Sequence, residues 1–306
     1  MKLKSIIAFL MTAIIAFSLC GCAEIQEFLD EDLSGADTSL NESSLDESSL
    51  PEHNNSGKLI SHYIDVGQGD SEFIELPNGE TMLIDAGTSA YGETVVDYIK
   101  NLGYSKIDYL VGTHPHADHI GGMQEVVKSF DIGSIYMPKA STNTKTYENL
   151  LTAIKDKGLK IKTAKAGVSV VSDSDLKVEM LAPNSSEYDD LNNYSAVVKI
   201  TYKNNKFLYM GDAEKVSEDE ITADVSADVI KIGHHGSTSS SSAEFVKKVN
   251  PTYAVICVGK DNDYGHPKDT ILKRWEKIGA EILRTDNNGS IEITSDGDNI
   301  SVKTEK

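Results

Sequence analysis

Three histidines and one aspartate lie within six residues of this sequence: His114, His116, Asp118 and His119. They follow a short apolar run, residues 107–112, that is typical of a β-strand. The first two histidines can chelate one cation from an extended loop, while the aspartate and the last histidine can serve a neighbouring cation. Imidazole and carboxylate ligands suit zinc, manganese or iron. The alternative is chance clustering on a surface loop, but the whole chain has only eight histidines. The sequence therefore predicts a metal centre at the end of a strand.

The chain from residue 58 onward alternates strand and helix patterns. Strands are predicted at residues 59–66, 71–76, 81–85, 107–112, 196–202, 206–210, 228–232, 253–258 and 280–284. Helices are predicted at residues 92–102, 120–130, 242–249 and 268–277. Hairpins come first, then α/β alternation, then more hairpins. This order favours an α/β fold with two mixed β-sheets packed face to face and helices on the outer faces, an αββα sandwich formed by one domain, residues 58–306.

The first 22 residues are predicted to be a lipoprotein export signal. Lys2 and Lys4 precede an apolar run, and Leu19-Cys-Gly-Cys22 resembles a bacterial lipobox. The alternative is a membrane anchor that is not cleaved, but the apolar run is short for a membrane span. We expect the rest of the chain to be extracytoplasmic and anchored to the cell membrane through lipid on Cys22. Cys257 would then be the only thiol left.

Residues 23–57 are predicted to be a disordered linker. The segment contains ten acidic residues and no lysine or arginine, and its serine-rich repeats bury too little apolar surface to fold. The whole chain has a formal charge of −19, which excludes a generic nucleic-acid coat because phosphate neutralisation needs a basic surface. Residues 58–306 carry 38 acidic and 27 basic residues, or −11. We expect this domain to be a monomer.

The histidine block resembles the signature of the metallo-β-lactamase superfamily. Three further motifs occur in that family's order: Leu83-Ile-Asp85-Ala-Gly87, Tyr209-Met-Gly211-Asp212 and Lys231-Ile-Gly-His234-His235-Gly-Ser237. The segments 62–70 and 192–195, together with Tyr264-Gly-His266-Pro267, are similar to the ComEC-type branch. That branch includes the hydrolase-like domain of the DNA-uptake competence channel. The resemblance covers residues 58–304.

The resemblance implies two divalent metal ions, zinc or manganese. The first site would hold His114, His116 and Asp212, and the second would hold Asp118, His119, Asp212 and His234. Many family members have one more histidine ligand, but no histidine lies between His119 and His234 here. An amide oxygen of Asn192 or Asn193 is the candidate for that position, so the first site should be the weaker one. His234 is preferred to His235 because the family's last histidine usually follows a strand and a small residue, although the two assignments can be exchanged.

Other residues of these motifs have expected roles around the metals. Asp118 would orient the attacking hydroxide, and His235 or His266 would stabilise the developing charge or protonate the leaving oxygen. Outer contacts or substrate contacts are expected from Asp70, Asp85, Asn192, Asn193, Ser195 and Ser237. The structural alternatives are a tight turn for Asp70, a strand-end cap for Asp85, a helix cap for Asp212 and an ordinary turn for His266.

The branch resemblance implies a phosphodiesterase or nuclease that acts on DNA outside the membrane. The acidic domain counts against a broad DNA groove, although five lysines are candidates to line one edge of a groove: Lys139, Lys145, Lys231, Lys260 and Lys268. One alternative is a surface hydrolase of phosphorylcholine esters or lactones. Another is a non-catalytic, metal-dependent binding lipoprotein, which the complete ligand set disfavours because a binding module needs no activated water.

Overall fold

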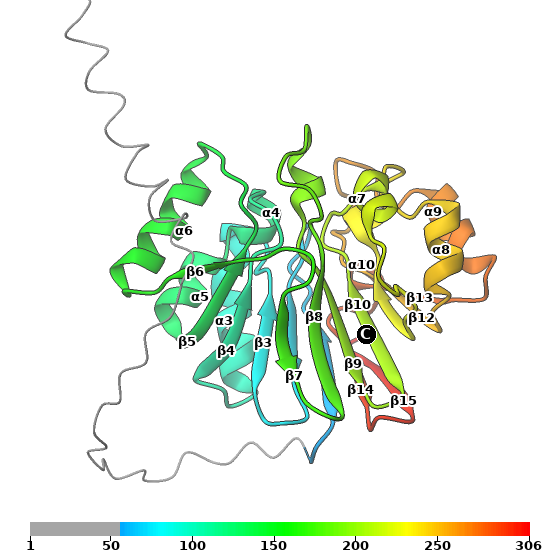
Figure 1. Ribbon diagram of the computed structural model, residues 1–306, viewed down its shortest axis with the longest axis horizontal. Coiled ribbons are helices and arrows are strands. Elements are labelled where there is room, and N and C mark those ends of the chain that lie inside the picture. Colours follow the sequence, from blue (N-terminus) through cyan, green and yellow to red (C-terminus); the bar gives the residue numbers. More distant parts are fainter. Residues whose placement is uncertain (1–55) are drawn as a thin grey trace, which may run out of the picture. The chain divides into compact units, whose positions relative to one another are not determined.

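Two β-sheets form the centre of the computed structural model, which describes residues 56–306 (Figure 1). The first sheet has eight strands in the spatial order β15-β14-β1-β2-β3-β4-β5-β6. Its strands are β1 (Leu59–Tyr63), β2 (Glu72–Glu75), β3 (Thr81–Ile84), β4 (Lys106–Val111), β5 (Asp131–Met137), β6 (Ile161–Thr163), β14 (Ile291–Ser295) and β15 (Ile300–Thr304). The predicted export signal, 1–22, and nearly all of the predicted linker, 23–57, lie outside the described residues.

The second sheet has seven strands in the order β13-β12-β11-β10-β9-β8-β7. They are β7 (Ser169–Ser172), β8 (Leu176–Ala182), β9 (Val197–Tyr202), β10 (Asn205–Tyr209), β11 (Val229–Lys231), β12 (Tyr253–Ile256) and β13 (Glu281–Arg284). Both sheets are mixed. The strand pairs within β3–β6 and within β10–β13 are parallel, and all other pairs are antiparallel.

Helices cover the outer faces of the two sheets. The helices are α3 (Gly92–Asn101), α4 (Ala117–Ile120), α5 (Met123–Ser129), α6 (Lys145–Asp156), α7 (Lys215–Glu220), α8 (Ala243–Val249), α9 (Asp269–Glu276) and α10 (Thr285–Asn288). Figure 1 shows α3, α5 and α6 on one side of the sandwich and α8 and α9 on the other. The predicted αββα sandwich is therefore confirmed. In the part of the chain that the structure describes, no helix is long and apolar enough to cross a membrane.

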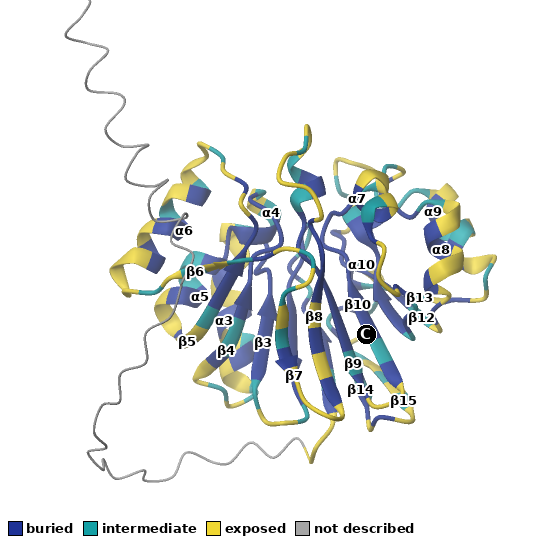
Figure 2. Ribbon diagram, in the orientation of Figure 1, coloured by how far each residue is buried: buried dark blue, intermediate teal, exposed yellow. Residues whose placement is uncertain are grey.

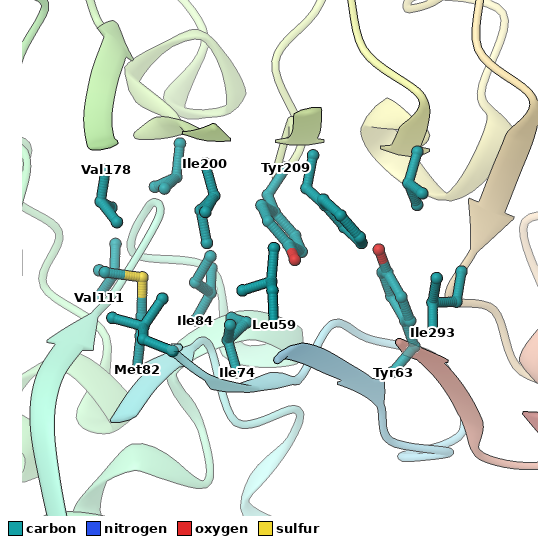
Figure 3. Close-up of a cluster of buried hydrophobic side chains, with 14 of the residues drawn as sticks. Leu59, Tyr63, Ile74, Met82, Ile84, Val111, Val178, Ile200, Tyr209 and Ile293 are labelled. Atoms are coloured by element: carbon teal, nitrogen blue, oxygen red, sulfur yellow. The ribbon is translucent and has the colours of Figure 1, made fainter. Parts of the chain in front are cut away.

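Apolar side chains of both sheets fill the space between them (Figure 3). Tyr63 of β1 and Tyr209 of β10 stack across this space with ring centroids 6.1 Å apart, and the Tyr209 hydroxyl donates a hydrogen bond of 2.9 Å to Ser61 Oγ. A second core packs α8 and α9 against the second sheet through Phe245 and Trp275. Figure 2 shows that the strands are mostly buried and that the helices expose their outer faces. The core thus holds the strand ends in fixed positions.

The parallel strand pairs bring four strand ends to one edge of the sandwich. Ile84 of β3 lies beside Val111 of β4, and Tyr209 of β10 lies beside Lys231 of β11. The residues that follow these strands therefore meet, as ligand-binding residues do at the carboxyl ends of parallel strands. Helix α4, which follows β4, lies at the upper end of the sandwich in Figure 1.

The helix predicted at 120–130 is instead two helices, α4 and α5, that are separated by Gly121 and Gly122. A Cβ atom on Gly122 would lie 2.2 Å from the carbonyl oxygen of Ala86, so only glycine allows the chain to pass the strand end this closely. The break leaves α4 as a single turn against the loop that follows β3. This turn carries Asp118 and His119 to the shared edge.

Candidate metal centre

The carboxylate of Asp212 lies at the centre of the histidine cluster. Its Oδ1 atom is 3.2 Å from Nε2 of His119 and 3.6 Å from Nε2 of His235. Its Oδ2 atom is 3.9 Å from Nε2 of His114, and that atom is 3.0 Å from Nδ1 of His116. The two oxygens of one carboxylate thus face two different groups of imidazoles, which is the arrangement expected of a carboxylate that bridges two cations.

The structure exchanges the positions expected for the two adjacent histidines. Nε2 of His235 lies 3.5 Å from Oδ2 of Asp118, and among the described residues Asp118, His119 and His235 offer three ligand atoms within 4.8 Å of one another. His234 contacts Ser239 and Glu214 through Nδ1, at 3.0 and 3.3 Å, and its Nε2 atom lies 3.7 Å from Oδ2 of Asp212. The structure therefore places His235, and not His234, at the predicted second site. His234 lies beside the other oxygen of Asp212, the one that faces His114, and also lines the pocket.

The backbone conformation explains why His235, and not His234, lies at the second site. His234 and His235 both have left-handed conformations, with φ values of 50°. Asp85 is also left-handed, with a φ of 54°. Such conformations are unfavourable for residues with a side chain and are concentrated at functional sites. Consecutive left-handed residues turn the chain sharply after β11, so the side-chain directions cannot be extrapolated from the strand.

Buried oxygen atoms hold both imidazoles from behind: a carboxylate for His119, and the Cys257 carbonyl with the nearby Asp70 for His235. Oδ2 of Asp85 is 2.7 Å from Nδ1 of His119, and the Thr113 backbone and hydroxyl donate to Asp85 at 2.8 and 2.6 Å. Oδ1 of Asp70 is 3.2 Å from Nδ1 of His235, which also lies 2.8 Å from the carbonyl oxygen of Cys257. Carboxylate and carbonyl oxygens only accept hydrogen bonds, so each Nδ1 carries a proton. Each Nε2 atom is therefore free to bind a cation at the centre.

The two candidate asparagines differ in their surroundings. The Asn193 amide donates to Glu214 at 3.2 Å and accepts from the Ser217 backbone at 3.4 Å. Asn192 lines the pocket, and its Oδ1 atom is buried without a hydrogen-bond partner. Asn192 therefore has the available oxygen, while Asn193 stabilises the surrounding loop. Ser195 accepts a hydrogen bond of 3.0 Å from the Asp212 backbone, which fixes the start of the Asp212 segment.

A pocket of about 410 Å³ opens over these groups. It is lined by Gln68, His116, Ala117, Asp118, Thr144, Asn192, Asp212, His234, His235, Tyr264 and His266. His266 is fixed by Asn262, which accepts from its backbone N–H at 3.0 Å and donates to its carbonyl at 2.7 Å. Ser237 does not line this pocket: its hydroxyl lies 3.0 Å from that of Ser239, the residue that contacts His234.

The donor atoms at the centre fit a divalent metal ion. Nε2 of His119, Nε2 of His235 and Oδ1 of Asp212 are buried without hydrogen-bond partners, which is rare for polar atoms in folded proteins. Burial alone would lower the pKa of His235, but Asp212 and Asp70 raise it to about 10. Burial alone would raise the pKa of Asp118, but His235 and His119 hold it well below its usual range. The carboxylates thus require positive charge at the centre, and nitrogen and oxygen ligands of this kind bind zinc, manganese or iron.

Residues 64–260 match the sequence profile of the metallo-β-lactamase superfamily. This match covers more than half of the chain, and the sandwich and the metal centre agree with it. The chain therefore belongs to the metallo-β-lactamase superfamily.

Within the superfamily, the chain is similar to bacterial competence proteins. It is 32% identical to ComE operon protein 3 of Bacillus subtilis over 249 residues, which are 75% of this chain and 32% of that protein. It is 29% identical to competence protein ComA of Neisseria gonorrhoeae over 234 residues, which are 75% of this chain and 31% of that protein. The predicted ComEC-type relationship is confirmed. The chain spans about a third of the length of these curated relatives.

Solved structures with the same fold are more distant in sequence. CmlA, a diiron β-hydroxylase from Streptomyces venezuelae, superposes with a TM-score of 0.52 at 17% identity, over 74% of this chain and 52% of that chain. Igni18, a metallo hydrolase from Ignicoccus hospitalis, also has a TM-score of 0.52 at 17% identity, over 77% of this chain and 98% of that chain. At this identity the two structures support the fold alone.

One residue at the centre does not lie where the sequence predicts it. The side chain of Lys231 is fully buried and does not line the edge of a DNA groove, so this prediction is wrong. The signal was present in the sequence, because a lysine inside the apolar run Val229-Ile-Lys231-Ile requires a buried partner.

Proposed function

We propose that the chain is a metal-dependent hydrolase that cleaves phosphodiesters, and that DNA outside the membrane is its substrate. The proposal is carried by one observation: Asp212 lies between two groups of imidazoles at the bottom of an open pocket. This arrangement supports two divalent ions, zinc or manganese, that share one carboxylate. Such a pair suits a phosphodiester, whose attacking and leaving oxygens both need stabilisation.

Each group of the centre then has a defined role. His114, His116 and Asp212 would hold one ion, and Asp118, His119, His235 and Asp212 would hold the other. When bound, the ions would acidify a water molecule and neutralise charge on the phosphoryl group. Asp118 is held in its charged form, and its side chain is 28% exposed, so it can orient the attacking water. Asp85 and Asp70 keep the imidazoles of His119 and His235 in their productive orientation.

The charge state of His266 decides between its two expected roles, stabilising the developing charge and protonating the leaving oxygen. Burial and the neighbouring His234 and His235 lower the pKa of His266 to about 4. The neutral imidazole is a poor general acid at neutral pH, and bound cations would lower its pKa further. His266 would therefore stabilise the developing charge through its N–H group and would not protonate the leaving oxygen.

Two observations support a nucleic acid as the substrate. The relatives named above include a competence protein, and a third relative, from Haemophilus influenzae, is named recombination protein 2. Tyr264 is 63% exposed at the pocket mouth and stacks on His266 with ring centroids 5.7 Å apart. An exposed aromatic ring on a fixed loop can stack on a nucleobase beside the scissile phosphate. Lipid on Cys22 would keep this activity at the outer surface of the cell membrane.

A second candidate, hydrolysis of phosphorylcholine esters, is favoured by a neighbouring cavity. This cavity has a volume of about 790 Å³ and shares Asn193 and Glu214 with the surroundings of the metal centre. Its lining includes five carboxylates and the tyrosine pair Tyr188 and Tyr194. Aromatic rings with nearby carboxylates bind quaternary ammonium groups, so this lining suits choline.

Hydrolysis assays on the purified full-length chain separate these candidates. The substrates are single-stranded DNA, bis-p-nitrophenyl phosphate, p-nitrophenylphosphorylcholine and a simple lactone, each with and without added Mn²⁺ or Zn²⁺. We expect metal-dependent cleavage of DNA and of bis-p-nitrophenyl phosphate. Preferential cleavage of the choline ester would favour the second candidate. If no substrate is cleaved with either metal, a non-catalytic binding protein becomes the better interpretation.

A further inference from the structure

A fully buried lysine lies directly beneath the metal centre. Lys231 is the last residue of β11, and its side chain is 0% exposed. Its ammonium group donates to Oδ2 of Asp70 and, at 3.1 Å, to the carbonyl oxygen of Gly211. Asp70 belongs to the loop after β1 and Gly211 follows β10, so one side chain joins the first sheet's loop to the second sheet's strand end.

Both partners of Lys231 are directly connected to the metal centre. Oδ1 of Asp70 contacts Nδ1 of His235 at 3.2 Å, and the peptide of Gly211 immediately precedes Asp212. Asp70 also lies close enough to His235 and Asp212 for the three to form a group of potential ligands. A carboxylate in this position has two possible uses: it can orient an imidazole from behind, or it can bind the cation itself.

Packing alone does not explain why a lysine occupies this position, so its role is attributed to its charge. A buried ammonium group is costly, and a methionine would fill similar space without that cost. The ammonium group contacts the carboxylate of Asp70 directly, whereas the nearby Glu72 accepts a hydrogen bond from the Cys257 thiol at 3.4 Å. Asp70 is therefore the anion that the ammonium group neutralises.

We propose that Lys231 is a positioning residue of the metal centre, an internal cation that holds Asp70 as the partner of His235 and fixes the Gly211–Asp212 peptide. With Lys231 in place, Asp70 is kept behind the imidazole. Without it, Asp70 loses the contact that keeps it behind the imidazole, and the Gly211–Asp212 peptide loses a hydrogen bond, so the ligands of the centre lose their alignment. This inference rests on the proposed metal centre but not on the identity of the substrate.

The test measures metal binding by four variants of the full-length chain. They are Lys231→Met, Asp70→Asn, the double variant, and Lys199→Met as the matched control. Lys199 is also buried, at 5% exposed, but it lies in β9 and pairs with Asp224 at 3.1 Å. Calorimetric titration of chelator-stripped protein with Mn²⁺ gives the number of sites and their affinities. Hydrolysis is measured separately.

We expect Lys231→Met to weaken Mn²⁺ binding by about 10- to 100-fold, the usual effect of removing a residue that supports metal ligands. Lys199→Met should change the affinity by less than about twofold, because Lys199 supports no ligand. When Lys231→Met is added to Asp70→Asn, the Mn²⁺ affinity should change by less than about threefold. A residue that acts through the Asp70 carboxylate loses its effect once an amide replaces that carboxylate. If Lys231→Met does not fold, the double variant decides the matter, because it leaves no unpaired buried charge.

Two results would overturn the inference. One is wild-type Mn²⁺ affinity in Lys231→Met. The other is a loss of Mn²⁺ affinity that is as large when Lys231→Met is added to Asp70→Asn as when it is made in the wild-type chain. A failure of the proposed function looks different: the wild-type chain would bind Mn²⁺ with the expected dependence on Lys231 but would cleave no phosphodiester.

Discussion

Nε2 of His235, which follows β11, lies 3.5 Å from Oδ2 of Asp118, in α4. The adjacent His234 contacts Glu214 and Ser239 through Nδ1, and its Nε2 atom lies 3.7 Å from Oδ2 of Asp212. The two neighbouring histidines therefore lie beside different oxygens of Asp212: His235 beside Oδ1 and His234 beside Oδ2.

This relationship predicts different effects for the two histidines. His235→Ala should lower metal affinity by at least about 10-fold, because it removes a ligand of the second site. His234→Ala should leave the second site intact and weaken only the first site, because Nε2 of His234 lies beside Oδ2 of Asp212, the oxygen that faces His114. Elemental analysis together with steady-state kinetics of both variants checks this. Loss of metal from the second site in His234→Ala, with no loss in His235→Ala, would favour His234 as the ligand that the sequence predicts.

The two asparagines should also differ. Asn192→Ala should raise the Mn²⁺ concentration needed for half-maximal activity, because the available Oδ1 atom is removed. Asn193→Ala should instead lower stability by about 1 kcal/mol for each lost hydrogen bond. Metal titration of activity and thermal unfolding separate the two effects. An increased metal requirement in Asn193→Ala, with no change in Asn192→Ala, would be the opposite of what the contacts imply.

Most of the metal centre could be predicted from the sequence because its residues directly follow apolar strands. Asp85 and Asp212 are examples, since each comes after a run of buried residues. The choice between His234 and His235 could not be made, because both residues are left-handed and the turn is set by tertiary packing. Sequence patterns define the end of a strand well but do not define the direction of side chains in an irregular loop.

The sequence predicts no helix or strand between residue 130 and the strand at 196–202. The edge strands β6 and β7 are only three and four residues long and are partly exposed, so their apolar patterns are weak. Helix α6 has a readable signal, because its buried residues Tyr147, Leu150, Leu151 and Ile154 recur at helical spacing. The short edge strands depend on their neighbours in the sheet and not on their own sequence.

The thiol of Cys257 should be unreactive in the native protein. Its side chain is fully buried, and burial, together with the charge of Glu72, raises its pKa well above the usual range. Thiolate is the reactive form, so labelling of the protein with a thiol reagent should be slow until the chain is unfolded. The Cys20→Ala/Cys22→Ala variant isolates this thiol. Rapid and complete labelling of that variant would contradict the buried position.

Tyr264 should affect only substrates that carry a nucleobase. Tyr264→Ala should lower kcat/KM for thymidine p-nitrophenyl phosphate by about 5- to 100-fold, the range expected for one base–aromatic stack. The same variant should leave methyl p-nitrophenyl phosphate nearly unchanged, and Tyr264→Phe should behave like the wild type. Equal losses on both substrates would mean that Tyr264 supports the loop of His266 and does not bind a base.

The most direct test of the metal centre is the metal content and activity of Asp212→Asn. Asp212 is the residue whose two carboxylate oxygens face both groups of imidazoles, so the variant keeps the shape but removes the shared charge. Two variants serve for comparison. His114→Ala should retain about one metal ion per chain because the second site keeps its own ligands, and Asp224→Asn, far from the centre, should behave like the wild type. We predict that Asp212→Asn loses metal from both sites and nearly all turnover. Retention of two metal ions and the wild-type rate in Asp212→Asn would show that Asp212 does not bridge the cations, and would contradict this account of the site.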